Sequence, residues 1–287
     1  MSSFEGALKN PGDKAKRDAN AGRGWYAVLA RTGLVAKGLS FGLVGALALK
    51  LALGDGGKAT SRQGALASLA HQSFGKFALI ALAIGFAAYA LWRFVQAFAE
   101  RSDGKDGGAK VWVKRAGYVA RGLIYAGLTF STLKILNGSG GGQSQDAKAH
   151  KSTAMVLSWP GGRWIVGAAG LVVIAVGCWN LYRGLAKKFE DKWRLGRVSA
   201  SIKTWGVRAG VAGHVARFVV FGLIGIFLVK AAVDYKPSDA IGLDGALQKL
   251  ANRSYGPYLL GLTAAGLIAY GIYCLFDARL RDVSANA

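Results

Sequence analysis

Acidic residues, cysteines and histidines are all scarce in this chain of 287 residues, which has 15 Asp and Glu against 37 Lys and Arg. Its two cysteines, Cys178 and Cys274, lie in separate apolar segments without a Cys-x-x-Cys motif, so neither a disulfide framework nor a redox centre is expected. The three histidines form no metal-site motif, and there is no phosphate-binding loop and no Gly-x-Ser-x-Gly elbow. We therefore expect no metal, no cofactor and no enzymatic activity.

Apolar residues and glycine are abundant instead, with 52% hydrophobic residues and 42 glycines, a composition typical of polytopic membrane proteins. A span needs about 20 mostly apolar residues to cross the hydrocarbon core. Six segments are long enough: residues 33–53, 77–98, 116–136, 164–184, 211–233 and 258–276. None of them contains Asp or Glu, which disfavours a cation transporter and leaves anions or neutral solutes.

Lys and Arg are distributed unevenly between the two sides of these spans. Residues 1–31, 93–115, 183–208 and 277–287 hold 22 of them, and the alternate loops 54–76, 137–163 and 234–257 hold nine. The positive-inside rule then predicts a bacterial inner-membrane protein with both termini in the cytoplasm. Residues 1–24 lack an apolar stretch and are interpreted as a basic cytoplasmic tail and not as a signal peptide.

One pattern occurs three times inside the apolar segments: a basic residue, an aromatic residue four positions later and a lysine thirteen positions later. The copies are Lys37, Phe41 and Lys50; Arg121, Tyr125 and Lys134; and Arg217, Phe221 and Lys230. A glycine stands four positions before each basic residue, at Gly33, Gly117 and Gly213. The second span of each copy carries a matching aromatic pair: Tyr89 with Trp92, Trp179 with Tyr182, and Tyr270 with Tyr273.

These copies predict an all-α integral membrane protein of six transmembrane helices, built as three parallel two-helix repeats around a pseudo-threefold axis. The repeats occupy residues 25–100, 101–190 and 191–287, and the last begins with a basic cytoplasmic connector. Related sequences at 64–70 and 245–251 predict short amphipathic helices in two outer loops. The middle outer loop lacks that sequence, and its Gly-rich start at 137–142 and Trp-Pro-Gly-Gly at 159–162 predict a flexible stretch followed by a turn.

Several of these segments also resemble a known family. They are Arg-Thr-Gly-Leu-Val-Ala-Lys-Gly at 31–38, Arg-Ala-Gly-Tyr-Val-Ala-Arg-Gly at 115–122, the two Gly-Ala-Leu loop helices and Tyr-Ala-Leu-Trp-Arg at 89–93. They resemble the bacterial membrane proteins catalogued as domain of unknown function 1206, in which a paired-span unit recurs three times. The resemblance implies the three-repeat fold and implies no activity.

Lys37, Arg121 and Arg217 are the strongest functional candidates, because a cation one to two turns inside the cytoplasmic edge costs a few kcal/mol unless it reaches the interface or finds a partner. In one interpretation they extend to lipid phosphates. In the other they face the pseudo-threefold axis and bind an anion, a phosphate-bearing lipid head group or acidic residues of a partner. The sequence leaves both interpretations open.

The other candidate site residues are expected at the membrane boundaries. Lys50, Lys134 and Lys230 lie about 20 Å further along the helices, where we expect them to anchor to lipid. The aromatic residues expected at the interface are Phe41, Tyr125, Phe221, Trp25 and Trp205.

The connector 185–210 carries seven Lys and Arg residues with Trp193 and Trp205 among them, a pattern that favours anionic lipid over nucleic acid beside a membrane. We therefore expect a non-enzymatic scaffold or accessory subunit that binds anionic lipid through a basic cytoplasmic face, with a protein partner or a second copy as further candidates. The alternative is an anion or small-solute channel or carrier whose path is lined by Lys37, Arg121 and Arg217.

Overall fold

Helices form all of the regular secondary structure in the described part of the chain. The computed structural model describes residues 11–54, 61–99, 108–139, 144–193 and 199–282. Within these ranges the α-helices are α1 (Pro11–Ala52), α2 (Arg62–Ala70), α3 (Gly75–Ala99), α4 (Gly108–Leu136), α5 (Gln145–Leu157), α6 (Gly162–Leu185), α7 (Ala200–Val233), α8 (Leu243–Ala251) and α9 (Gly256–Leu280). Two single 3-10 turns, η1 (Glu190–Lys192) and η2 (Pro237–Asp239), lie in the connections.

Six of these helices are long and apolar enough to cross a membrane, which confirms the predicted spans. They run over Gly24–Ala52, Gly75–Phe98, Val111–Leu136, Gly162–Leu185, Ala200–Val233 and Gly256–Leu280. The first and fifth begin well before the predicted residues 33 and 211, so Lys37 and Arg217 lie near the middle of their spans. Of the predicted tail, residues 1–10 lie outside the described residues, and α1 is already helical from Pro11.

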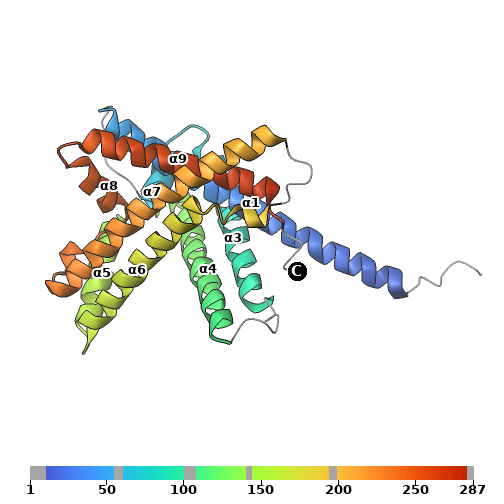
Figure 1. Ribbon diagram of the computed structural model, residues 1–287, viewed down its shortest axis with the longest axis horizontal. Helices are drawn as coiled ribbons and strands as arrows, with labels where there is room; N and C mark the ends of the chain where they lie inside the picture. The colour runs from blue at the N-terminus through green and yellow to red at the C-terminus, as the bar shows by residue number, and fades with distance from the viewer. Residues whose placement is uncertain (1–10, 55–60, 100–107, 140–143, 194–198, 283–287) are drawn as a thin grey trace, which may run out of the picture.

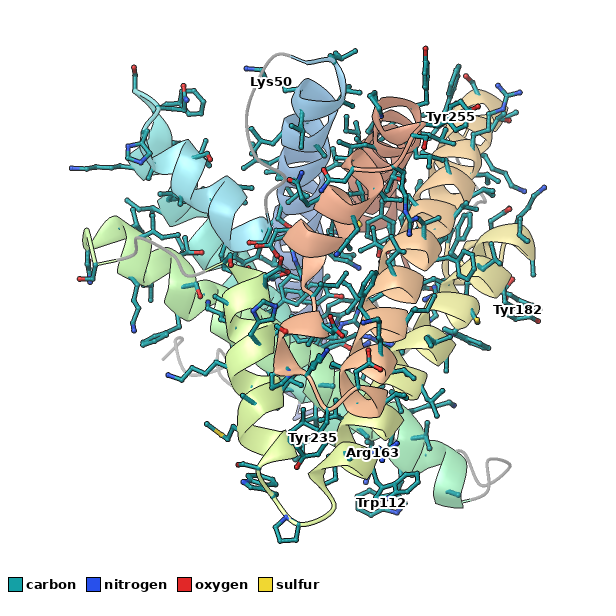
Figure 2. All side chains as sticks on the ribbon, turned by 90° about the vertical axis from the view of Figure 1, so that its left-hand side faces the viewer. Lys50, Trp112, Arg163, Tyr182, Tyr235 and Tyr255 are labelled. Carbon is teal, nitrogen blue, oxygen red and sulfur yellow. The ribbon has the colours of Figure 1, made fainter. Side chains whose placement is uncertain are left out.

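The spans are organised in antiparallel pairs that join one repeat to the next. The pairs that pack along their lengths are α3 with α4, α6 with α7, and α9 with α1. Figure 1 shows these pairs spreading in different directions from the middle of the molecule. In Figure 2, Lys50 and Tyr255 at the ends of α1 and α9 lie at the opposite edge from Arg163 and Tyr235 at the ends of α6 and α7. The strongest packing therefore joins spans of different repeats, including the third with the first, a feature that the repeat boundaries do not predict.

Within the first and third repeats, the two spans approach closely at equivalent positions. A Cβ atom at Gly33 of α1 would lie 2.5 Å from Cβ of Tyr89 on α3. A Cβ atom at Gly213 of α7 would likewise lie 2.6 Å from Cβ of Tyr270 on α9. Small residues at these positions let the helix backbones approach each other. In these two repeats, the glycine four positions before the basic residue therefore makes room for the aromatic residue of the second span.

All three outer loops contain a short helix, and these helices gather at one end of the molecule, which we call the loop-helix end. The helices predicted at 64–70 and 245–251 are confirmed as α2 and α8. The middle loop, which lacks that sequence, also forms a helix, α5, over residues 145–157, while residues 140–142 of the flexible stretch predicted at 137–142 lie outside the described residues. A local cap stabilises the start of α5, because the Ser144 hydroxyl accepts a hydrogen bond from the Ala147 N–H.

The N-terminal ends of these short helices meet and cap one another. Asp146 of α5 accepts hydrogen bonds from the N–H groups of Gly242 and Gly245 at the start of α8. Asp244 of α8 accepts one from the Gln145 N–H at the start of α5, at 3.0 Å. The Gln145 side chain also donates to Gln63 of α2, at 2.7 Å. Because α8 has no side-chain cap of its own, Asp146 supplies the acceptor that a helix N-terminus requires.

We expect alanine substitutions of the repeat glycines to differ in their effect on stability. Gly33→Ala and Gly213→Ala should each lower the free energy of unfolding by about 1–3 kcal/mol, because the new methyl group overlaps the facing tyrosine. Gly117→Ala should leave stability unchanged or raise it by up to about 1 kcal/mol through helix propensity, since Arg121 Nη2 at 3.9 Å is the nearest atom to its Cβ position. Thermal unfolding in detergent measures all three variants. An equal loss at Gly117 would contradict the close approach as the cause.

The stability of the loop-helix end should depend on pH through Asp244. Burial and the neighbouring Asp146 carboxylate raise the pKa of Asp244. A raised carboxyl pKa means that folding favours the protonated form, so its contribution to stability is present at low pH and is lost as pH rises through the raised pKa. Between about pH 7 and about pH 5, Asp244→Asn should reduce the gain in melting temperature on acidification.

Asp234→Asn provides the matched control, because Lys230 lowers the pKa of Asp234. A lowered carboxyl pKa stabilises the fold at higher pH, and that contribution is lost on acidification. Because Asp234 titrates below about pH 4 in both the folded and the unfolded state, the control should leave the pH dependence between about pH 7 and about pH 5 unchanged. Two variants that shift it in the same direction would show that Asp244 does not act as described.

Candidate functional site

Lys37 of α1 points into the bundle between two buried tyrosines. Its Nζ lies 5.7 Å from the ring centroid of Tyr89 on α3 and 5.1 Å from that of Tyr270 on α9. Both tyrosines are at most 2% exposed. Of the two orientations that the sequence leaves open, Lys37 takes the inward one, and within the described residues it forms no ion pair with a carboxylate.

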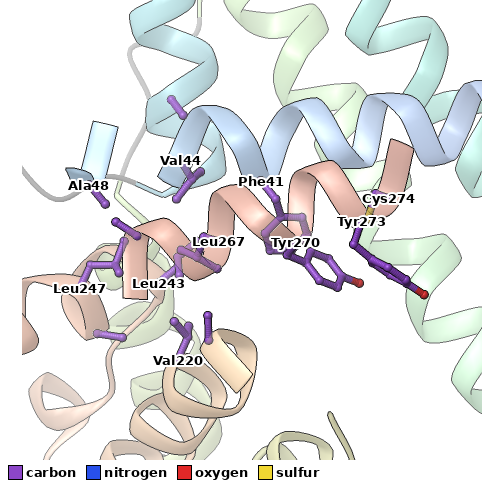
Figure 3. Packing of buried hydrophobic residues seen from close by; sticks show 14 of the residues in the cluster. Phe41, Val44, Ala48, Val220, Leu243, Leu247, Leu267, Tyr270, Tyr273 and Cys274 are labelled. Atoms are coloured by element: carbon purple, nitrogen blue, oxygen red, sulfur yellow. The ribbon is translucent and has the colours of Figure 1, made fainter. Parts of the chain in front are cut away.

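Arg217 of α7 reaches the same tyrosine from the third repeat. Its Nη1 donates a hydrogen bond to the Tyr270 hydroxyl at 2.6 Å, and its Cζ lies 4.6 Å from the Tyr270 ring centroid. Phe41 packs edge-on against Tyr270, with ring centroids 4.9 Å apart (Figure 3). The Arg217 Nε is buried and has no hydrogen-bond partner among the described residues. Two cations from different repeats therefore share one aromatic partner.

Two further arginines join this group. The Arg62 Cζ of α2 lies 5.1 Å from the Phe41 ring centroid and 5.7 Å from that of Tyr125. Arg93 of α3, which is 6% exposed, donates to the Tyr89 hydroxyl at 2.6 Å and to Gln96. We call the following residues the cation–aromatic cluster: Lys37, Phe41, Arg62, Tyr89, Arg93, Tyr125, Arg217 and Tyr270.

Nearby carboxylates are engaged elsewhere. Asp277 of α9 accepts hydrogen bonds from Arg281 and from the Trp193 indole, at 3.0 Å for the indole. In the part of the chain that the structure describes, no Asp or Glu forms an ion pair with a cation of the cation–aromatic cluster. Cation–π contacts leave the formal charge in place. The cluster therefore carries a net positive charge inside the spans, an environment that favours an anion.

Arg121, the third predicted cation, takes a different position. It is exposed, and its ring contact is with Tyr118 of its own helix, at 5.9 Å from Cζ to the centroid. The residue that matches Tyr89 and Tyr270 in this repeat is Trp179 of α6, which is 58% exposed. An indole has a donor but no acceptor, so Trp179 lacks the hydroxyl oxygen through which the two tyrosines bind arginine.

The two spans of the middle repeat do not pack against each other as the spans of the other repeats do. Within the described residues, α4 and α6 make little contact, whereas α1 packs on α3 and α7 on α9. A Cβ atom at Gly117 would meet only its own helix's Arg121, although Gly117 matches the closely packed Gly33 and Gly213. We call the sides of α4 and α6 that carry Gly117, Arg121 and Trp179 the α4–α6 opening.

The remaining predicted residues lie away from the cluster or differ from expectation. Lys50 and Lys134 are exposed towards the loop-helix end, and Lys230, also exposed, pairs with Asp234 and Asp239. Phe41 and Tyr125, which we expected at the interface, are buried because they pack between helices. Phe221 is half-buried with its centroid 5.2 Å from the Arg217 Cζ, while Trp25 and Trp205 are exposed.

The remaining titratable groups of the spans offer no second centre. His214 is buried and stacks on Phe189, with its Nδ1 2.7 Å from the Gly210 carbonyl oxygen. Cys178 is exposed and Cys274 is buried, and both are free thiols. Over the described ranges, no three His, Cys, Asp or Glu residues gather as a metal site would require. Sequence reasoning missed Arg62, because the other two loop helices have Gln145 and Leu243 at the equivalent first position.

Comparison with known proteins agrees with this architecture. A family profile described as Domain of Unknown Function (DUF1206) matches residues 32–100, 116–187 and 212–281, the three span pairs of the repeats. The chain is also similar to "Uncharacterized protein YxxB" of Bacillus subtilis (strain 168), with 30% identity over 251 residues that cover 88% of this chain and 90% of that protein. No solved structure matches the chain. This multi-pass membrane protein belongs to the family described as Domain of Unknown Function (DUF1206).

Proposed function

We propose that this protein is a non-enzymatic membrane scaffold or accessory subunit that binds the phosphate of an anionic lipid at the cation–aromatic cluster. One observation carries the proposal: Lys37 and Arg217 turn inward to Tyr270 and have no carboxylate partner within the described residues. An unpaired cation near the centre of a span costs about 2.5–3.5 kcal/mol on insertion scales. A phosphate oxygen bound there would offset that cost through charge-assisted hydrogen bonds.

The proposal includes an orientation in the membrane. We place the protein in the bacterial inner membrane with both termini and the basic connectors in the cytoplasm, which the distribution of Lys and Arg supports. The connector around α7 presents the exposed Trp205, with Arg208 over its ring at 5.5 Å. Such a face suits the anionic lipids of the cytoplasmic leaflet, and it leaves room for a protein partner or a second copy.

Removing the inward cations should weaken lipid binding. The double variant Lys37→Gln with Arg217→Gln should lower the affinity for phosphatidylglycerol by about ten-fold or more, since one lost charge-assisted hydrogen bond costs about 1.5–3 kcal/mol. Native mass spectrometry of protein extracted gently from its membrane measures the retained lipid. The matched control is Lys50→Gln with Lys134→Gln, which removes the same charge from exposed positions. Equal losses in both variants would show that binding follows net charge and not the cluster.

A second candidate function, an anion or small-solute path, is favoured by the position of Arg62. Its guanidinium contacts Phe41 from the loop helix α2, while Arg217 contacts the same ring from α7, with 5.7 Å from Cζ to the centroid. Cations from a loop helix and from a span thus meet on one aromatic ring. Cations that meet on one aromatic ring from two helices suit an anion that passes through the bundle.

Flux measurements separate the two candidates. If anions pass through the cluster, proteoliposomes should show anion flux above empty liposomes, and replacing Lys37, Arg121 and Arg217 by Gln should abolish it. Arg62→Gln should also reduce the flux, because it removes the cation on the loop-helix side of Phe41. Circular dichroism and the melting temperature check that the variants fold. Wild-type protein that binds lipid without any flux would eliminate the path and leave the scaffold.

A further inference from the structure

In the first and third repeats the two spans pack closely against each other, and in the middle repeat the equivalent interface between the spans is open. In repeats one and three, Tyr89 and Tyr270 pack against Gly33 and Gly213 and are buried. In repeat two, the matching Gly117 has no facing side chain within 4 Å, and Trp179 is exposed. One sequence pattern thus produces two closed interfaces and one open interface.

The α4–α6 opening is positively charged. Arg121 of α4 is exposed there, and it is close enough to Arg93, Arg183 and Arg217 for their charges to act on it. Arg183 is on α6, so both helices of the opening contribute a guanidinium near this point. No carboxylate forms an ion pair with Arg121 or Arg183 in the described segments. An occupant of the opening should therefore carry negative charge.

The surroundings of the opening are apolar. Both helices are membrane spans, and they expose large apolar side chains, among them Ile124 on α4 and Leu171 and Val172 on α6. Between two spans, such side chains face the acyl chains of the bilayer. A small soluble anion would match the arginines and leave this apolar surface without a partner. A molecule with one anionic group and long acyl chains matches both.

We infer that a single anionic phospholipid enters sideways between α4 and α6, with its phosphate at Arg121 and its acyl chains against the apolar faces of the two helices. The inference rests on the proposed function, because it names the route by which lipid phosphate reaches the cation–aromatic cluster. Trp179 and Tyr182, both at least 50% exposed, lie along the α6 side of this route. The entry is then one per chain and belongs to the middle repeat.

A bulky residue at Gly117 tests the route. Gly117→Trp fills the opening, and Gly127→Trp is the matched control, because a Cβ atom at Gly127 on the same helix meets nothing within 4 Å. Wild type and variants are placed in nanodiscs with phosphatidylglycerol and phosphatidylcholine in equal parts, and bound lipid is measured by native mass spectrometry. We expect Gly117→Trp and Arg121→Gln each to lower phosphatidylglycerol affinity about ten-fold, with Gly127→Trp within about two-fold of wild type. The melting temperature confirms folding, and Gly117→Leu replaces the tryptophan variant if that variant does not fold.

Other outcomes overturn the inference in distinguishable ways. If Gly117→Trp retains lipid while the Lys37 and Arg217 double variant loses it, lateral entry is wrong and the proposed function stands. If inorganic phosphate displaces the lipid from wild type and from Gly117→Trp equally, the ligand enters from water. If the wild type is a lipid-free dimer that Gly117→Trp dissociates, a second copy fills the opening. A wild type that binds no phosphatidylglycerol overturns the proposed function together with the inference.

Discussion

A cation inside an apolar span must be compensated. Here aromatic rings and tyrosine hydroxyls surround the cations, in place of carboxylates that would neutralise their charge. Lys37 lies between the rings of Tyr89 and Tyr270, and Arg217 binds the hydroxyl of Tyr270. A desolvated cation–π contact contributes about 2 kcal/mol and leaves the charge itself in place. The interior therefore remains positive, and the proposed ligand chemistry follows from that charge.

The close approach of the helices is what brings the rings to the cations. Gly33 and Gly213 allow the second span of a repeat to come near the first, which places Tyr89 and Tyr270 within reach of the basic residue one turn further along. The glycine, the basic residue and the aromatic residue of the second span therefore act as one packing unit. The glycine and the basic residue are four positions apart, so they lie on the same face of the helix, about one turn from each other.

Spans, repeats and two of the loop helices were predictable because they depend on local composition and on internal repetition. The inward direction of Lys37 was not predictable, because α1 carries apolar residues on its exposed side, such as Val35 and Leu39, as well as on its buried side, so its periodicity does not identify a buried face. Helix α5 was missed because a serine cap and contacts with α8, almost a hundred residues away, stabilise it without the Gly-Ala-Leu sequence. The position of Arg62 depends on where a loop helix docks, a tertiary property that its own neighbours in sequence do not encode.

The middle repeat shows how one substitution pattern can change an interface while the fold is kept. Gly117 and Arg121 are present, so the first span has the same elements as in the other repeats. The second span has Trp179 where the others have tyrosine, and an indole cannot accept the hydrogen bond that Arg93 and Arg217 donate to Tyr89 and Tyr270. Of these two bonds, only the one from Arg217 to Tyr270 joins two helices, α7 and α9; Trp179 offers Arg121 no such acceptor, and α4 and α6 make little contact within the described residues. The packing of α4 on α3 and of α6 on α7 holds both helices in place, so the fold tolerates one unclosed interface.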